Sequence, residues 1–146
     1  MNQSIPNGMA IARGINLDVS EAGAWVIRAN DDAFPLEAAR DFFRAWLLLE
    51  RPFDDVKAAL DRGLYSANPA TPFPFSKLIG SALMGGSEQW TNRAMTWVPF
   101  LTMAEKISLK DLFIELRDSR WASQKSRQLA RKYVHEIERN AQGAKN

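Results

Sequence analysis

The sequence predicts a mainly α-helical protein of about six helices, built as a compact bundle or as stacked antiparallel helical hairpins. Apolar residues recur at helical spacing from residue 34 onward, and the breaks between these segments are short, which makes neighbouring helices antiparallel. The 146 residues are 46% hydrophobic and 25% charged, as in a globular domain. We therefore expect residues 1–146 to form a single helical domain, with residues 1–10 and 141–146 frayed.

The first thirty residues are the least helical part of the chain and leave room for a short N-terminal β-hairpin. Residues 15–19 alternate between apolar and polar side chains, as in a half-buried strand. Residues 24–29 are a candidate second strand, and Gly23 before them fits a turn. Because a two-stranded hairpin is marginal alone, helices would have to cover it.

The first helix is expected to begin near Phe34 and to end at Pro52. Asp31 and Asp32 offer N-cap oxygens, and Pro35 suits the first helical position. The side chains that recur at helical spacing, and so should face inward, are Leu36, Ala39, Phe43, Trp46 and Leu47. The apolar arc is widened by Phe42, Ala45 and Leu49, so we expect this helix to be buried on most sides. A second helix is predicted over residues 53–62, where Gly63 ends it.

The central segment, residues 66–75, contains three prolines and is expected to be an ordered loop or extended crossing, pinned to the body by its phenylalanines. A short helix over residues 76–84 follows it. Ser87 is then expected to cap a helix that Pro99 breaks.

Two further helices complete the prediction. One begins at Ser108, where Asp111 three residues later resembles a capping box. The last helix spans about residues 120–140 and carries one apolar and one polar face.

The composition excludes several kinds of chemistry. The chain has no cysteine and a single histidine, His135, which excludes disulfides, thiol nucleophiles and Cys- or His-rich zinc sites. The Gly85-Gly86-Ser87 turn lacks the ending of a phosphate-binding loop. No apolar run approaches the ~18 residues of a membrane span, and the N-terminus lacks the pattern of a secretory signal. We therefore predict a cytoplasmic, non-catalytic protein without cofactor, metal or membrane contact.

Acidic residues concentrate in the first part of the chain and form one candidate partner-binding surface. Residues 1–62 hold ten Asp/Glu and seven Lys/Arg, whereas residues 63–146 hold seven and twelve. Two doublets, Asp31-Asp32 and Asp54-Asp55, could bind a metal in an enzyme, but both lie where a helix is expected to begin, so capping explains them. The acidic candidates are Asp31, Asp32, Asp41, Glu50, Asp54, Asp55 and Asp61.

Basic residues of the last predicted helix form the second candidate surface. Arg120, Arg127 and Arg131 are spaced i, i+7 and i+11, so they could follow phosphates or meet an acidic protein surface. Because Glu136 and Glu138 interrupt the stripe and no second basic helix reinforces it, the pattern favours a solvated outer face over a binding surface. Trp121 falls outside the apolar arc and either packs on the preceding turn or is an exposed anchor. The basic candidates are Arg120, Trp121, Lys125, Arg127, Arg131 and Lys132.

Two segments, residues 89–97 (QWTNRAMTW) and 120–131 (RWASQKSRQLAR), are similar to helical-repeat proteins. More particularly, they resemble small all-helical immunity proteins of bacterial contact-dependent toxin systems. The resemblance implies a cytosolic protein that binds and blocks one toxin domain. The acidic first half could oppose a basic toxin, although this chain is mildly basic overall. The leading hypothesis is a toxin-neutralising immunity protein, and the alternative is a nucleic-acid-binding regulator that uses the basic C-terminal helix.

Overall fold

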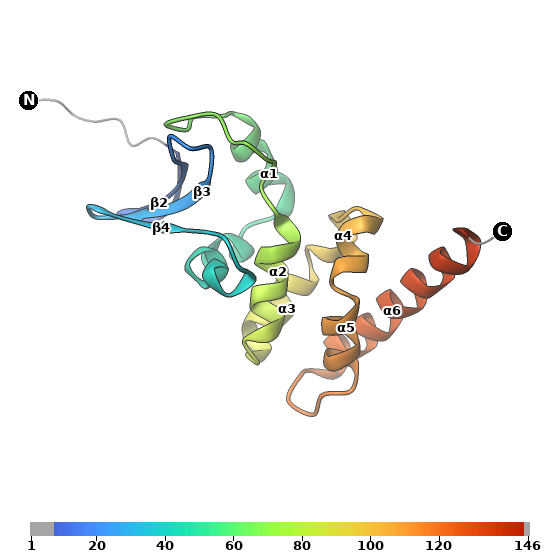
Figure 1. The fold of residues 1–146 in the computed structure, drawn as a ribbon. Helices are drawn as coiled ribbons and strands as arrows, with labels where there is room; N and C mark the ends of the chain where they lie inside the picture. The colour runs from blue at the N-terminus through green and yellow to red at the C-terminus, as the bar shows by residue number, and fades with distance from the viewer. Residues whose placement is uncertain (1–7, 145–146) are drawn as a thin grey trace, which may run out of the picture. The chain divides into compact units, whose positions relative to one another are not determined.

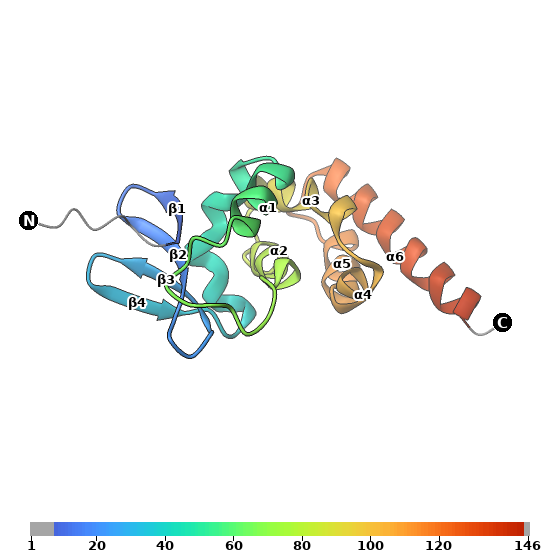
Figure 2. The same cartoon turned by 90° about the horizontal axis from the view of Figure 1, so that it is seen from above.

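Four strands form the N-terminal part of the structure, which is a computed structural model that describes residues 8–144. They are β1 (Met9–Ala12), β2 (Ile15–Val19), β3 (Trp25–Ala29) and β4 (Asp32–Pro35). All pairs are antiparallel, in the order β1-β2-β3-β4 (Figures 1 and 2). The expectation of a mainly helical bundle is therefore wrong. The chain is mixed α/β, and the predicted hairpin is β2–β3, which a strand extends on either side.

Tight turns explain the two additional strands. Ala12 pairs with Ile15, so Arg13 and Gly14 alone connect β1 to β2, and Gly14 adopts a φ of 77°. Ala29 likewise pairs with Asp32, which leaves a two-residue turn.

The turn between β3 and β4 corrects the predicted role of the first acidic doublet. Asn30 has a φ of 56°, a left-handed conformation that asparagine tolerates better than most residues. Asp31 completes this turn and Asp32 opens β4. Neither carboxylate caps a helix, because the chain continues as a strand to Pro35 and only then becomes helical.

The chain divides into two compact units, Met1–Pro74 and Phe75–Asn146.

The residues expected to fray, 1–10 and 141–146, are at the two ends of the chain. Residues 1–7 and 145–146 are outside the described part of the chain. Of the others, Met9 and Ala10 belong to β1, and residues 141–144 continue the last helix.

Two helical segments follow the sheet in the first unit. The first, η1 (Ala39–Glu50), is a 3-10 helix that begins five residues later than predicted. Asp41 in its first turn accepts hydrogen bonds from the amides of Glu37 and Ala38 at 3.2 and 2.9 Å. The second, α1 (Phe53–Asp61), follows Pro52 as predicted and carries Asp54 and Asp55 in its first turn.

The proline-rich segment that ends the first unit is tied to the sheet by named contacts. The amide and hydroxyl of Ser66 donate to the buried carboxylate of Asp18 on β2 at 2.8 and 2.6 Å. The indole Nε1 of Trp25 on β3 donates to the carbonyl of Thr71 at 3.0 Å. Phe73 lies edge-on to the Trp25 ring. The predicted ordered crossing is therefore confirmed.

The second unit is helical throughout its described part. Its elements are α2 (Phe75–Met84), α3 (Glu88–Met95), η2 (Val98–Phe100), α4 (Met103–Ser108), α5 (Lys110–Arg117) and α6 (Gln124–Ala144). Ser87 caps α3, as predicted, by accepting from the amide of Trp90 at 3.3 Å. Pro99 lies in η2, after the end of α3, so the predicted break is also confirmed.

Two helix starts of the second unit differ from the prediction. Thr102, not Ser108, begins a capping box, because Thr102 and Glu105 exchange side-chain to backbone hydrogen bonds at 3.0 and 3.2 Å. The Ser108 hydroxyl instead donates to the carbonyl of Glu105. Ser123 precedes α6 and accepts from the amide of Ser126 at 3.1 Å, so the last helix begins at Gln124 and not near Arg120.

Packing in the second unit centres on α5 and α6, which lie side by side in both views (Figures 1 and 2). The rings of Phe113 and Tyr133 are 5.5 Å apart at their centroids. In α2, a Cβ added at Gly80 would lie 3.3 Å from a methyl of Leu109, so glycine permits this close approach. The α6 face that packs inward is Ser126, Ala130, Tyr133, Val134 and Ile137.

Candidate functional site

The predicted acidic surface lies entirely in the first unit but is spread over several elements. Asp31 and Asp32 are at the β3–β4 turn, Asp41 and Glu50 are in η1, and Asp54, Asp55 and Asp61 are in α1. Two of these carboxylates already have local partners. Asp41 accepts from backbone amides near the start of η1, and Asp61 pairs with Lys57 at 3.1 Å.

The predicted basic surface is divided by the geometry of α6. Arg120 and Trp121 precede the helix, so they do not extend its stripe, although Trp121 is 41% exposed. At about 100° per residue, Lys125 and Lys132 lie along one flank of α6, whereas Arg127 and Arg131 lie along the opposite flank. A nucleic-acid surface on this helix would therefore consist of two separate cationic pairs.

The charge asymmetry of the sequence coincides with the division into units. Residues 63–74 carry no charged side chain, so the first unit holds all ten acidic and seven basic residues of the N-terminal segment. The second unit holds the remaining seven acidic and twelve basic residues. One unit is thus acidic and the other basic, and each would attract partners of opposite sign.

An exposed aromatic surface lies on the first unit and was not expected. The guanidinium Cζ of Arg44 is 3.7 Å from the ring centroid of Phe34 and 4.8 Å from that of Phe43. Phe43 is 53% exposed, and Leu47, one turn of η1 beyond Arg44, is 39% exposed. We call the four residues Phe34, Phe43, Arg44 and Leu47 the Arg44 patch.

The Arg44 patch corrects the predicted inward face of the first helix. Phe43 and Leu47 were expected to face the core because they recur at the 3.6-residue period of an α-helix. In η1 the period is about three residues, so the same spacing points side chains in other directions. The fully buried side chains follow intervals of three, and two of them were predicted as part of the wider apolar arc: they are Phe42, Ala45 and Leu48.

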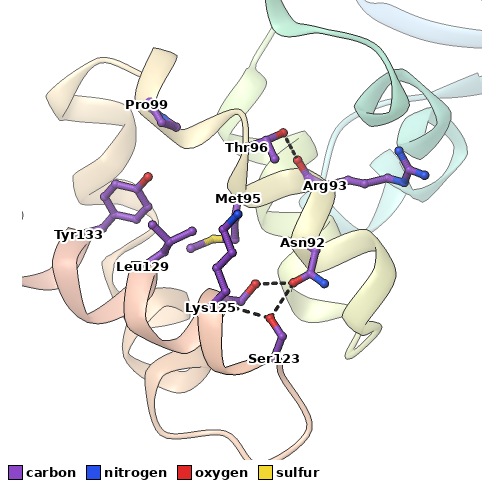
Figure 3. A pocket seen from close by; sticks show the side chains of 10 residues that line it. Asn92, Arg93, Met95, Thr96, Pro99, Ser123, Lys125, Leu129 and Tyr133 are labelled. Atoms are coloured by element: carbon purple, nitrogen blue, oxygen red, sulfur yellow. Dashed lines mark hydrogen bonds between the residues drawn. The ribbon is translucent and has the colours of Figure 1, made fainter.

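A pocket of about 590 Å³ lies in the second unit between the α3–η2 segment and α6 (Figure 3). Met95 and Tyr133 are almost completely buried and form its floor, whereas Thr96, Pro99 and Lys125 are exposed at its rim. The residues that line it are Asn92, Arg93, Met95, Thr96, Pro99, Ser123, Lys125, Ser126, Leu129 and Tyr133. We call this cavity the α3–α6 pocket.

A hydrogen-bond network joins the two sides of the α3–α6 pocket at one end. Asn92 Oδ1 on α3 accepts from the hydroxyls of Ser123 and Ser126 at 2.9 and 2.5 Å. An amide oxygen cannot take up the proton of a serine, so neither hydroxyl is activated as a nucleophile here. The network thus positions helices, and the pocket that it closes is suited to binding.

Tyr133 lies at the other end of the α3–α6 pocket. Burial, together with the charge of Glu136, raises the pKa of Tyr133 above its usual value of 10.0. The phenol is therefore protonated at neutral pH and able to donate a hydrogen bond. Lys106 pairs with Glu136 at 2.8 Å, with its ammonium 5.9 Å from the Tyr133 ring centroid, so the nearby positive and negative charges balance.

Removing the amide of Asn92 is expected to destabilise the second unit. Asn92→Ala should lower its free energy of unfolding by about 1–2 kcal/mol, because Ser126, which is 2% exposed, loses its acceptor. Urea denaturation followed by circular dichroism measures the change. Asn140→Ala, an exposed substitution of the same kind on α6, is the control and should cost little. Equal stability of the two variants would contradict a structural role for this network.

Three further findings bear on the nature of the site. Within residues 8–144, no three histidine, cysteine or carboxylate side chains are grouped so that they could hold a metal ion. In the same part of the chain, no helix combines the length and apolar character needed to span a lipid bilayer. Comparisons with protein-family models, with curated proteins and with solved structures find no match for this chain.

Proposed function

We propose that this protein is a non-catalytic binding module that recognises another protein through the Arg44 patch. The observation that carries the proposal is an arginine that contacts the faces of two aromatic rings beside an exposed leucine. Isolated exposed apolar residues are normal on a protein surface, whereas a cluster that includes Phe43, Arg44 and Leu47 is typical of an interaction site.

The stacking of Arg44 favours its use as an anchor. Arginine and large aromatic residues are enriched among the few side chains that carry most of the energy of an interface. A guanidinium held over the rings of Phe34 and Phe43 has less conformational freedom to lose on binding than a free one. Its N–H groups can still donate to a carboxylate or carbonyl of the partner.

The charge of the first unit specifies the kind of partner. Asp31 and Asp32 lie two to three residues before Phe34, at the turn that leads into β4. The unit as a whole has more acidic than basic residues. A partner with an apolar hollow surrounded by basic side chains would complement it, and opposite charge would accelerate the encounter.

In its most specific form, the proposal makes the protein a cytosolic immunity protein that binds and neutralises a toxin domain. This form of the proposal is supported by the resemblance of residues 89–97 and 120–131 to such proteins. Non-catalytic action is supported by the α3–α6 pocket, where the hydroxyls of Ser123 and Ser126 donate to an amide oxygen and not to a base.

The test is binding to a toxin domain encoded beside this gene, measured by isothermal titration calorimetry. We expect a 1:1 complex whose affinity falls at least about 100-fold with Phe43→Asp or Arg44→Glu, because both substitutions change central anchors. Arg62→Glu, an exposed charge reversal on the same unit outside the patch, is the matched control and should have a far smaller effect. Absence of a complex with the wild-type chain would overturn the toxin assignment. If the Phe43→Asp variant bound as tightly as the wild type, the assignment of binding to the Arg44 patch would be overturned.

A further inference from the structure

We infer that the α3–α6 pocket binds a small organic acid, that is, a carboxylate joined to an apolar body. The pocket lies in the second unit and shares no residue with the Arg44 patch. This inference is therefore independent of the proposed protein partner, and either can fail alone.

The apolar part of the ligand is specified by the floor of the pocket. Met95, Leu129 and Tyr133 present aliphatic, thioether and aromatic surface, and Pro99 adds a ring at the rim. A volume of about 590 Å³ lies within the range of roughly 300–1,000 Å³ in which proteins enclose small molecules. An apolar group of limited size therefore fits.

The charge of the ligand is specified by the rim. The ten lining residues include two cations, Arg93 and Lys125, and no carboxylate. Figure 3 shows the guanidinium of Arg93 directed away from the other lining side chains, whereas Lys125 extends from α6 toward α3. Lys125 is thus the cation that a bound group would meet.

The hydrogen-bonding groups left over at the Lys125 end of the pocket are donors. Asn92 uses its oxygen twice for serine hydroxyls, so its amide nitrogen remains to donate. The ammonium of Lys125, at the same end of the pocket, is a second donor. A carboxylate only accepts hydrogen bonds, so it complements these donors. An alcohol or an amine also carries donors of its own and complements them less well.

Charged groups outside the lining do not cancel the preference of the pocket for an anionic ligand. Glu136, the acidic group nearest to Tyr133, is paired with Lys106 at 2.8 Å. The first turn of α6 carries the positive end of the helix dipole, which has the same sign as Lys125. Lys125 and the start of α6 therefore both present positive charge to this end of the pocket.

The dimensions of the pocket limit the length of the ligand. The Asn92 network closes the end beside Lys125, and Tyr133 lies seven residues beyond Ser126 along α6, a rise of roughly 10 Å. A chain of about eight to ten carbons spans that length. Such a ligand would place its carboxylate beside Lys125 and its tail toward Tyr133.

The first experiment compares three probes of one chain length, each below its aggregation concentration. Decanoate, decanol and decylamine are titrated into the full-length protein and followed by calorimetry. We expect saturable 1:1 binding of decanoate, at least ten-fold tighter than decanol, with decylamine weakest. The advantage over decanol should shrink as salt is added, since Lys125 is exposed to solvent. Failure of decanoate to saturate, or equal affinity for decanol, would overturn the inference.

Matched variants locate the site. Lys125→Gln should weaken decanoate about ten-fold and leave decanol unchanged, whereas Lys132→Gln, the same change on α6 outside the lining, should alter neither. Leu129→Trp should weaken both probes by filling the pocket. Equal effects of the two lysine variants would overturn the assignment of the site, and circular dichroism of each variant establishes that it is folded.

A final arm distinguishes a free acid from the end of a polypeptide. A pentapeptide with an apolar last residue is titrated with its C-terminus free and with it amidated. Weaker binding of both peptides than of decanoate is the expected result. Tighter binding of the free-carboxylate peptide than of decanoate would overturn the assignment to a small acid.

Discussion

Replacing Trp25 by alanine is expected to lower the free energy of unfolding of the first unit by about 4 kcal/mol, the largest effect predicted for a single substitution in this chain. The buried indole lies edge-on to Tyr65 and Phe73, with ring centroids 5.1 and 5.3 Å away. Its Nε1 also donates to the Thr71 carbonyl at 3.0 Å. Alanine removes all three contacts, so the sheet and the proline-rich segment lose their common anchor.

Trp25→Phe separates the two contributions of this side chain. Phenylalanine keeps an aromatic ring against Tyr65 and Phe73 but has no donor for Thr71, so it should cost far less than alanine. Hydrogen exchange of peptides that cover residues 15–29 and 64–74 measures the local free energy of opening. Similar exchange rates in the alanine and phenylalanine variants would show that the ring contacts contribute little.

Replacing Asp18 by alanine is expected to cost about 3 kcal/mol at pH 7. Its carboxylate is completely buried and accepts from Arg28 Nε and from the Val19 amide, each at 2.8 Å, as well as from Ser66. Alanine leaves those donors without their acceptor. Glu21→Ala, which removes an exposed carboxylate from the neighbouring β2–β3 turn, is the control, and an equal loss of stability would contradict the prediction.

The lowered pKa of Asp18 also predicts how the free energy of unfolding depends on pH. Burial raises the pKa of this carboxyl, but the hydrogen bonds from Ser66, Arg28 and Val19 outweigh burial and hold the pKa below its usual value of 3.8. Because the folded pKa is the lower one, the stabilisation is complete above the unfolded pKa, about 3.9, and is lost as pH falls through the folded value.

Urea denaturation between pH 7 and pH 2 tests this dependence. Asp18→Asn cannot titrate at this position, so its stability should fall less steeply in acid than that of the wild type. Because other carboxylates titrate in the same range, the informative quantity is the difference between the two proteins. Parallel curves would contradict a role for Asp18 in the acid response.

The alternating residues of β2, together with the apolar segment of β3 after Gly23, made that hairpin predictable, but the strands on either side were not predicted. At the turn before β4 and in β4 itself, the residues Asp31, Asp32 and Pro35 have the composition of a helix start. The left-handed conformation of Asn30 decides otherwise, because it closes a hairpin that pairs Asp32 with Ala29. Pairing with β3, and not the local pattern of residues 31–35, therefore determines the structure of this segment.

The candidate sites depend on contacts between residues far apart in the sequence. Asn92 meets Ser123 and Ser126, which are 31 and 34 residues away, and Asp18 meets Ser66 across 48 residues. No spacing rule connects such pairs. Lys125, which the sequence did single out, lines the α3–α6 pocket. Its neighbours on α3, Asn92, Arg93 and Met95, belong to the segment 89–97 that carries the resemblance, but none of them was predicted as a site residue.

The two outer strands of the sheet are poor templates for further strand addition. Pro35 ends β4 without an N–H to donate, and the register of β1 shifts between Ala10 and Ala12. Interruptions of this kind are how natural proteins keep exposed sheet edges from joining across molecules. Both edges of the open sheet in the first unit are therefore poorly suited to pairing with the sheet of a second molecule.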